Sequence, residues 1–341
     1  LAVSGAVGVV ALIVLVRTGR LDGFGTIHLV YLCVVITVPL LGLTFAMLAI
    51  TRRASTRKAS RLLLAISLVL VIPAPVGFYA THIEPYRLRV SRVSVAIDPA
   101  RTGDDQVRIA VLSDLQTNGV GSYEYSAIDR LLESKPDLIL MPGDLFQGTN
   151  NEFNNELAKL RSVLARLKAP HGVYFVRGDV DGGDRADRAL AGTGIISLDD
   201  ETTDVVVGDR TLRIGGTRLD YLTQDAGAVR SELDGAGKDD TSEDGAIRIL
   251  LSHRPDTMLH LPERSRVDLT VAGHTHGGQV VIPLVGPLIT QSGVPRAVAR
   301  GGLHVVNGNA IYVSPGVGLE RSQAPQIRFL SPPAIGILDL A

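Results

Sequence analysis

Long apolar stretches occupy the beginning of the chain. Three of them contain no Asp, Glu, Lys or Arg: Leu1–Val16, Leu29–Ile50 and Leu62–Ala80. A helix of roughly 20 residues crosses a hydrocarbon core of about 30 Å. The second and third stretches reach that length, whereas the first is marginal, which leaves a signal peptide as its alternative interpretation. The pattern predicts a membrane region over residues 1–85 with three transmembrane helices, of about 1–16, 29–50 and 62–80.

The loops between these stretches predict an orientation. Thr51–Arg61 reads TRRASTRKASR, with five basic residues and no acid, whereas Arg17–Thr26 has two Arg and one Asp. Basic loops are retained on the cytoplasmic side of a membrane, so Thr51–Arg61 is expected to be cytoplasmic. The chain after Ala80 is then expected on the extracytoplasmic side of a multi-pass protein of the cell membrane.

A different pattern begins at Tyr86. Val107–Ser113 and Asp137–Met141 are short buried-strand runs, and Ala127–Glu133 between them has a helical pattern, which predicts a βαβ unit. Asp220–Asp244 is rich in Gly, Asp, Glu and Ser and is expected to be an exposed insertion. Residues 86–341 are sufficient for one large α/β domain with its own core. Further strands are expected at Val173–Val176, Ile247–Leu251, Leu269–Ala272 and Ile311–Val313.

Composition narrows the functional classes. The formal net charge of −1 hides a membrane region, residues 1–82, with seven basic residues and one acid, and a remainder with 27 basic and 34 acidic residues. Nucleic-acid binding depends on clustered Lys and Arg, so an acidic domain without a basic stripe argues against a nucleic-acid partner. The single Cys33 excludes a disulfide framework and a cysteine metal site.

Candidate chemistry lies in polar, Gly-rich turns directly after five of the expected strands. In open α/β sheets, sites form in the loops beyond the carboxyl ends of strands. An Asp in such a place is more often a helix cap or turn residue than a ligand. The segment Gly273–Gln279 (GHTHGGQ) is more specific, because its two imidazoles at i and i+2 point the same way in extended chain. The candidate ligands are Asp114, Gln116, Asp144, Asp179, His253, His274 and His276.

The order and spacing of these turns resemble the calcineurin-like metallophosphoesterase superfamily, and GHTHGGQ resembles its bacterial membrane-associated branch. The family pattern is D-x-H, G-D-x-x-D, G-N-H-D/E, H and G-H-x-H. The resemblance implies a four-layer αββα sandwich holding two divalent metal ions (Mn, Fe or Zn), which generate a hydroxide nucleophile. It places Asp114, His276 and the less suitable Gln116 at one metal, and Asp179, His253 and His274 at the other. Asp144 bridges the two, and the catalytic candidates are Asp144, His253 and Arg254.

Four positions depart from the family pattern: Gln116, Gln147, Asp179 and Val180. Gln116 and Val180 replace histidines, Asp179 replaces Asn, and Gln147 replaces the second acid of G-D-x-x-D. A Gln carbonyl is a weaker ligand than imidazole for borderline ions, so the first metal is expected to bind less tightly. The extra charge of Asp179 is expected to weaken attraction for a phosphate dianion. Because Val180 cannot protonate a leaving group, His171, Arg177 and Arg254 are the candidates to assist it.

Two functions follow as hypotheses. The first is a metal-dependent phosphohydrolase that cleaves a phosphodiester or pyrophosphate bond, with a lipid head group as a candidate substrate because the domain follows membrane helices. The alternative is a degenerate, non-catalytic member that binds a ligand or partner through a one-metal or metal-free site. A transporter is disfavoured because the apolar stretches lack acids and bases apart from His28 at an edge.

Overall fold

The computed structural model describes residues 22–51, 56–218, 227, 229, 233 and 245–341. The chain divides into two compact units. The first unit holds the chain up to Ile83 together with Glu320–Ile327, and the second holds Glu84–Leu319 and Arg328–Ala341.

The first unit is built from apolar helices. Two continuous helical segments, Gly23–Ile50 with 28 residues and Arg57–Tyr86 with 30, are long and apolar enough to cross a membrane by length and composition. The predicted span at 1–16 lies outside the described residues, so the described part of the chain contains two such segments. Their elements are α2 (Gly23–Leu32), the π-helical η1 (Cys33–Thr37), α3 (Val38–Ile50), α4 (Arg57–Val71), α5 (Pro73–His82) and η2 (Glu84–Tyr86).

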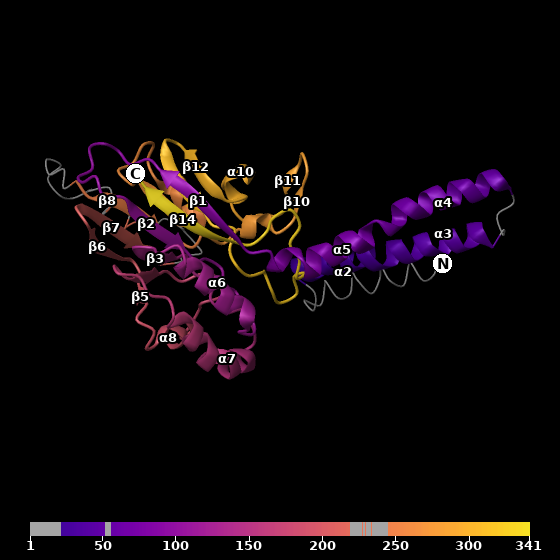
Figure 1. Ribbon diagram of the computed structural model, residues 1–341, viewed down its shortest axis with the longest axis horizontal. Helices are drawn as coiled ribbons and strands as arrows, with labels where there is room; N and C mark the ends of the chain where they lie inside the picture. The colour runs from indigo at the N-terminus through magenta and orange to yellow at the C-terminus, as the bar shows by residue number, and fades with distance from the viewer. Residues whose placement is uncertain (1–21, 52–55, 219–226, 228, 230–232, 234–244) are drawn as a thin grey trace. The chain divides into compact units, whose positions relative to one another are not determined.

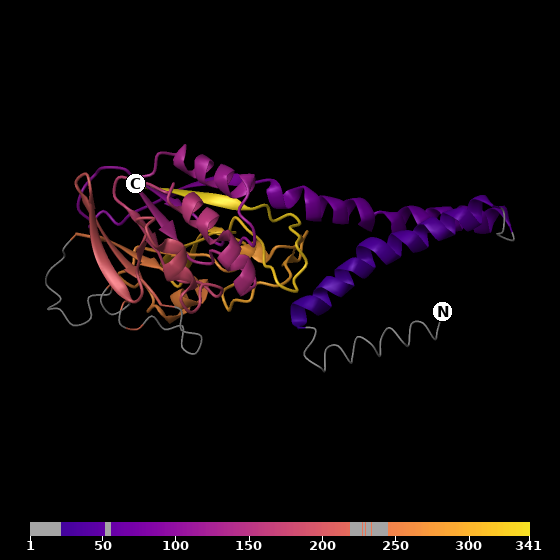
Figure 2. The same ribbon diagram turned by 90° about the horizontal axis from the view of Figure 1, so that it is seen from below.

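These helices pack along one another. Within the first unit, α3 and α4 lie side by side (Figures 1 and 2). The hydroxyl of Tyr31 in α2 donates to the carbonyl of Gly77 in α5 at 3.0 Å. α4 ends at Val71 and α5 begins at Pro73, which has no N–H to continue the helical hydrogen bonds. Glu320–Ile327 belongs to this unit through Gln323, whose side chain accepts from the Asp22 N–H at 3.3 Å.

The second unit contains two six-stranded sheets. In spatial order the first consists of β1 (Arg89–Val95), β14 (Ala334–Leu340), β2 (Val107–Val111), β3 (Leu138–Met141), β4 (Val173–Phe175) and β5 (Ile196–Ser197). The second consists of β12 (Gly302–Val306), β13 (Asn309–Val313), β9 (Leu269–Ala272), β8 (Ile247–Leu251), β7 (Arg210–Gly216) and β6 (Glu201–Val207). All six predicted strands are confirmed, with ends that differ by one or two residues.

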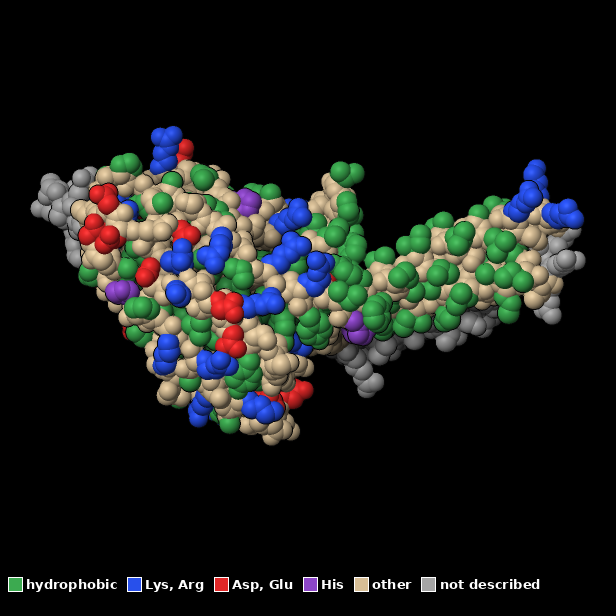
Figure 3. Space-filling view, viewed as in Figure 1, with side chains coloured by type: hydrophobic (Ala, Val, Ile, Leu, Met, Phe, Trp, Pro, Cys, Tyr) green, Lys and Arg blue, Asp and Glu red, His purple; other side chains and the backbone are tan. Residues whose placement is uncertain are grey.

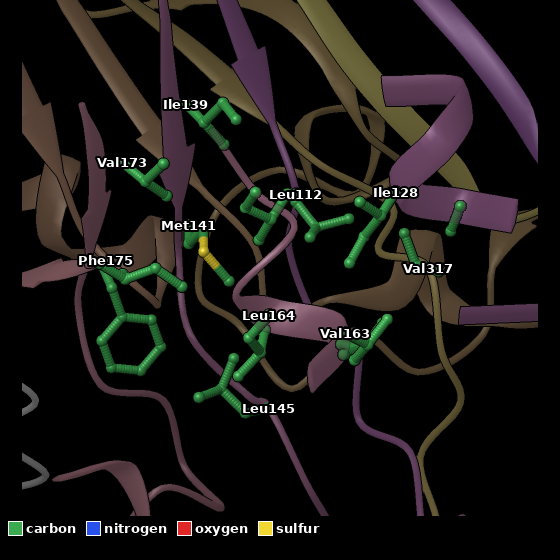
Figure 4. Packing of buried hydrophobic residues seen from close by; sticks show 14 of the residues in the cluster. Leu112, Ile128, Ile139, Met141, Leu145, Val163, Leu164, Val173, Phe175 and Val317 are labelled. Atoms are coloured by element: carbon green, nitrogen blue, oxygen red, sulfur yellow. The ribbon is translucent and has the colours of Figure 1, made fainter. Parts of the chain in front are cut away.

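Strand alternation separates the core into layers. Ile109, Val111 and Leu140 point into a cluster shared with Ile249 and Val271 of the second sheet. The alternate residues of the first sheet pack against helices, as Figure 4 shows for Ile139, Met141, Val173 and Phe175 beside Ile128, Val163 and Leu164. These helices are α6 (Ser122–Leu132), α7 (Asn150–Leu164) and α8 (Arg185–Leu190). Successive side chains of a strand face opposite sides of its sheet, so this alternation gives helix, sheet, sheet in three layers.

The fourth layer is thinner than the expected helical layer. Over the outer face of the second sheet, a third cluster contains Met258 of η3 (Pro255–His260) and Val298 of α10 (Arg296–Ala299). Val229 and Leu233 are buried in the same cluster. The interpretation of Asp220–Asp244 as an exposed insertion is therefore wrong at these two positions. Their apolar side chains pack in the core, although most of the segment is polar. The rest of that segment lies outside the described residues.

Two edge strands escaped prediction for a common reason. β1 and β6 lie at edges of the two sheets, and their exposed positions carry polar residues that interrupt the apolar run. The predicted strands lie in the interior of the sheets, where β2, β3 and β4 are parallel to one another and β8 is parallel to β9. Their carboxyl ends therefore place the five polar turns at one end of the two sheets.

Candidate metal centre

The turns after β2, β3, β4, β8 and β9 bring all the predicted ligand residues together. Two sets of side chains have ligand atoms within 4.8 Å of one another. One set is Asp179, His253 and His274, and the other is Asp114, Asp144 and His253. His276 is adjacent, with its Nε2 3.9 Å from Asp114 Oδ1. Among the described residues, the candidate metal ligands thus form two neighbouring groups. The two groups meet at His253 and Asp144.

His253 is held as a neutral ligand. Its Nδ1 lies 2.6 Å from the carbonyl of Pro142, which accepts a proton, so Nδ1 carries the hydrogen and Nε2 carries the lone pair. Burial, aided by the positive charge of His274, lowers the pKa of His253 to about 3. Nε2 forms no hydrogen bond with any described residue, yet it lies 3.5 Å from Asp144 Oδ2 and 3.9 Å from Asp179 Oδ2. A buried lone pair facing carboxylate oxygens is repulsive unless a cation lies between them.

His274 bonds on both sides of its ring. Its Nδ1 is 3.1 Å from Asp179 Oδ2, and its Nε2 is 3.0 Å from the carbonyl of Gln291. Burial alone would lower the pKa of His274, but the bond to Asp179 outweighs it and raises the pKa. A metal ion bound by His274 Nδ1 and Asp179 would take the place of this Nδ1 proton.

The carboxylates experience strong repulsion. Burial raises the pKa of Asp114 to about 7, although the Ser113 hydroxyl donates to it. Burial also raises the pKa of Asp144 well above its usual value, and the nearby charges of Asp181 and Asp114 raise it further. Carboxylates whose ionised form is disfavoured in this way are stabilised by an opposite charge within a few ångströms. The arrangement therefore fits cations better than it fits an apolar or anionic occupant.

Asp181 is a positioning residue that the sequence analysis did not assign. Its carboxylate is buried and accepts the backbone N–H groups of Asp144 at 2.6 Å, Leu145 at 2.9 Å and Gly178 at 2.8 Å. It therefore ties the turn after β3 to the turn after β4. Asp144 Oδ1 accepts in turn from the Val180 N–H at 2.9 Å. In the sequence, the only sign of this role was a second acid in the same turn, two residues after Asp179.

Two of the departures from the family pattern are partners of each other. The side-chain amide of Gln116 donates through Nε2 to Gln147 Oε1 at 2.9 Å. This bond holds the amide nitrogen of Gln116. The amide oxygen of Gln116, which is the atom able to ligate a metal ion, is not used in the bond. Gln147 therefore orients Gln116, in place of the acid and histidine of the family pattern.

Asp179 is paired with Arg254, the residue that follows the candidate ligand His253. Arg254 donates to both of its carboxylate oxygens, from Nε at 3.1 Å and from Nη2 at 2.8 Å. Although burial alone would raise the pKa of Asp179, the bonds from His274 and Arg254 lower it below its usual value. The guanidinium lies against both oxygens of Asp179 and offsets part of the extra negative charge that this residue brings to the centre.

The three candidates to assist a leaving group lie in different surroundings. His171 precedes β4, at the opposite end of that strand from Gly178, and the structure does not bring it to the site. Arg177 is 3.0 Å from Asp199 and 2.6 Å from Asp187 and is held by these acids. Of the three, only Arg254 contacts a candidate ligand.

The backbone of the centre is strained at its ligands. A positive φ is uncommon for residues other than glycine and costs on the order of 1 kcal/mol or more. Five candidate ligands have it: Asp114 (49°), Gln116 (36°), Asp144 (60°), His274 (70°) and His276 (49°). The turns that carry them are therefore shaped for the position of the side chains and not for local stability.

Motif glycines permit the close approach of these turns. A Cβ on Gly178 would lie 2.6 Å from the backbone nitrogen of Asp144, and a Cβ on Gly273 would lie 2.5 Å from Asp114 Oδ2. Any larger residue would push a candidate ligand out of place. The glycines are thus required by the packing of the ligands against neighbouring turns.

Arg328 supports the turn of His276 from behind. It is fully buried and donates to several carbonyls, among them those of His276 at 3.3 Å, Pro315 at 2.8 Å and Gly318 at 2.7 Å. Burial lowers the pKa of Arg328 to about 10, and the nearby Tyr123, Asp114 and Glu84 oppose that shift in part. An arginine in a loop near the chain end gives no signal of burial in sequence, so this role was missed.

Known proteins share these features. The sequence profile described as calcineurin-like phosphoesterase matches residues 107–278. The chain is 28% identical to the uncharacterized metallophosphoesterase YkuE of Bacillus subtilis, over 77% of this chain and 88% of that protein. It is 31% identical to the phosphodiesterase YaeI of Escherichia coli, over 55% of this chain and 65% of that protein.

Among solved structures, the Haemophilus influenzae NAD nucleotidase superposes on the chain with a TM-score of 0.42 and 16% identity, over 61% of this chain and 44% of that one. The profile match covers half of the chain and runs from the start of β2 to Gly278, the last residue of GHTHGG. The chain therefore belongs to the calcineurin-like phosphoesterase family.

Proposed function

We propose that the protein is a metal-dependent phosphohydrolase that cleaves a phosphodiester or pyrophosphate bond. The observation that supports it most is the buried Nε2 lone pair of His253, which faces Asp144 at 3.5 Å and Asp179 at 3.9 Å. A binding site without metal chemistry has no need of that repulsive arrangement. Phosphoester hydrolysis is the chemistry of the family to which the chain belongs.

The donors divide between two cation positions around Asp144. Asp179, His253 and His274 would hold one ion, and Asp114, His276 and Gln116 the other, with Asp144 between them. Two divalent ions so held polarise phosphoryl oxygens and lower the pKa of a bound water. Carboxylate and imidazole donors suit Mn²⁺, Fe²⁺ or Zn²⁺. Asp181 and Arg328 keep the surrounding turns in place.

The proposal that the substrate is a phosphodiester or a pyrophosphate rests on Val180, the residue after Asp179. Val180 contributes its backbone N–H to Asp144, and its side chain has no proton to give to a leaving group. General acid catalysis is worth about 10²–10⁴-fold, so its absence is tolerated best by a leaving group of low pKa, as in a pyrophosphate or an activated diester. The name of the relative YaeI, a phosphodiesterase, points the same way.

The two apolar helical segments support a membrane location for this activity. Arg57, Lys58 and Arg61 at the start of α4 follow the basic connection between the segments, which favours a cytoplasmic connection. The single segment Arg57–Tyr86 follows that connection, so one crossing would put the catalytic domain outside, and a lipid head group is then a candidate substrate.

Activity is the first test. The full chain, purified in detergent with Mn²⁺, is expected to hydrolyse an aryl phosphodiester, and Asp144→Asn is expected to lower kcat by about 10³-fold or more because it removes the shared charge. Asp204→Asn, which changes an exposed acid on β6, serves as the matched control and should retain turnover. Equal metal-dependent rates in Asp144→Asn and the unaltered chain would refute the assignment.

Metal content separates catalysis from the non-catalytic alternative. Elemental analysis of the full chain is expected to find two equivalents of divalent metal, the second lost first on dilution because an amide oxygen is a weak ligand for borderline ions. Gln116→His should retain the second equivalent at lower free metal. One equivalent or none in both proteins, even at saturating metal, would favour a ligand-binding role.

The role of Arg254 is tested by a pair of substitutions. Arg254→Met leaves Asp179 uncompensated and is expected to lower kcat/KM for a diester by about tenfold or more. If Arg254 acts by neutralising Asp179, the double variant Arg254→Met/Asp179→Asn recovers activity and lowers metal affinity relative to the unaltered chain. Activity that stays at the level of the single variant would show instead that Arg254 contacts the substrate.

Orientation is tested independently of activity. Alkaline phosphatase fused after Ala341 is expected to be active, and green fluorescent protein at the same place is expected to be dark, because each reporter works on one side of the membrane only. The opposite pair of results would place the domain in the cytoplasm.

A further inference from the structure

The hairpin that follows the GHTHGGQ segment is apolar and exposed. It is formed by β10 (Val281–Ile282) and β11 (Gly286–Pro287), which pair only with each other. From Val280 to Ile289 the sequence reads VVIPLVGPLI and contains no polar side chain. Leu284 at the tip is fully exposed and has a φ of 70°, and Val285 is 54% exposed. Apolar side chains held out in this way indicate a surface that is covered by something in use.

Basic side chains lie beside the hairpin. An open hollow of about 880 Å³ is lined by the hairpin together with Arg296, Arg300, His304 and Leu330, and no acid lines it. Arg296 and Arg300 are exposed, and neither guanidinium bonds to a side chain or carbonyl in the part of the chain that the structure describes. Figure 3 shows the apolar side chains gathered over the hairpin with Lys and Arg side chains next to them.

We propose that this surface, the β10–β11 hairpin with Arg296 and Arg300, docks on the anionic surface of a lipid bilayer. The apolar tip enters the boundary between head groups and acyl chains, and the guanidiniums contact lipid phosphates. The apolar tip matches the acyl chains of such a surface, and the unpaired positive charges match its anionic head groups. A second copy of the same surface fits poorly, because a symmetric contact would bring the arginines of both copies together.

The docking surface is connected to the metal centre at both of its ends. The hairpin begins directly after Gln279, three residues past His276, and the chain returns at Gln291, whose carbonyl lies 3.0 Å from His274 Nε2. The base of the hairpin is fixed by the Val281 N–H, which donates to the Phe329 carbonyl at 2.9 Å. On the proposed function, a bilayer held at this hairpin would present lipid head groups beside the centre.

The chain offers a direct test because it contains no tryptophan. Leu284→Trp and Val206→Trp each introduce a single fluorophore, the first at the tip and the second at an exposed valine on β6. Both full-length variants are reconstituted into bilayers of phosphatidylcholine and phosphatidylglycerol, with and without brominated acyl chains. Leu284→Trp is expected to emit at shorter wavelength and to be quenched about twofold or more by the brominated lipid, whereas Val206→Trp is not.

A charge reversal tests the arginines. Arg296→Glu/Arg300→Glu in the Leu284→Trp background should abolish the quenching in anionic bilayers, and the matched reversal Lys135→Glu/Arg264→Glu should leave it unchanged. Emission from Leu284→Trp that is unquenched overturns the proposal, and so does a blue shift without quenching, which would place the tip against protein. The readout needs no turnover, so it fails or succeeds independently of the proposed hydrolysis.

Discussion

The crowding of buried carboxylates at the ends of β2, β3 and β4 is the constraint on which the centre depends. Asp114, Asp144 and Asp181 are all buried, and each has a raised pKa because burial disfavours its charge. Asp181 is satisfied by three backbone N–H groups, which leaves the other two without comparable compensation. Removing one partner from a buried charged network is costly, so the network is complete only with cations. The neutral His253 offers such a cation the lone pair of Nε2, and His274 would offer that of Nδ1 once its Nδ1 proton is lost.

The fold gives up local stability to hold this arrangement. Five candidate ligands adopt a positive φ, and such strain persists only where the surroundings determine it. Here the surroundings are the two packed sheets, whose parallel inner strands end together, and the turns tied by Asp181 and Arg328. Gly178 and Gly273 let those turns approach within van der Waals contact. The rigid sheets thus supply the precision, and the strained turns supply the direction of the side chains.

Six inner strands and the candidate ligand residues were predictable because both follow from local pattern, whereas the inner strands β7 and β14 were missed. Apolar runs such as Ile247–Leu251 are buried on both faces, and each ends in a polar turn. The edge strands β1 and β6 were not predictable, since half-exposed positions carry Arg, Ser, Thr and Asp. The partners within the centre were also beyond the sequence. Arg328 lies 52 residues from the histidine that it supports, and Gln147 lies 31 residues from Gln116, so only the fold brings them together.

Three of the four departures from the family pattern, at Gln116, Gln147 and Asp179, have side-chain partners within the centre, which bears on whether the centre has decayed. Gln116 bonds to Gln147, and Asp179 bonds to Arg254 through both of its oxygens. A substitution that merely lost a ligand would leave its neighbours unsatisfied, and a buried unsatisfied group costs about 1–3 kcal/mol. Here the altered side chains at positions 116, 147 and 179 each have a polar partner inside the centre. Partners of this kind hold Gln116 and Asp179 in place beside the other candidate ligands, which favours a centre that still binds metal ions over one released from chemistry.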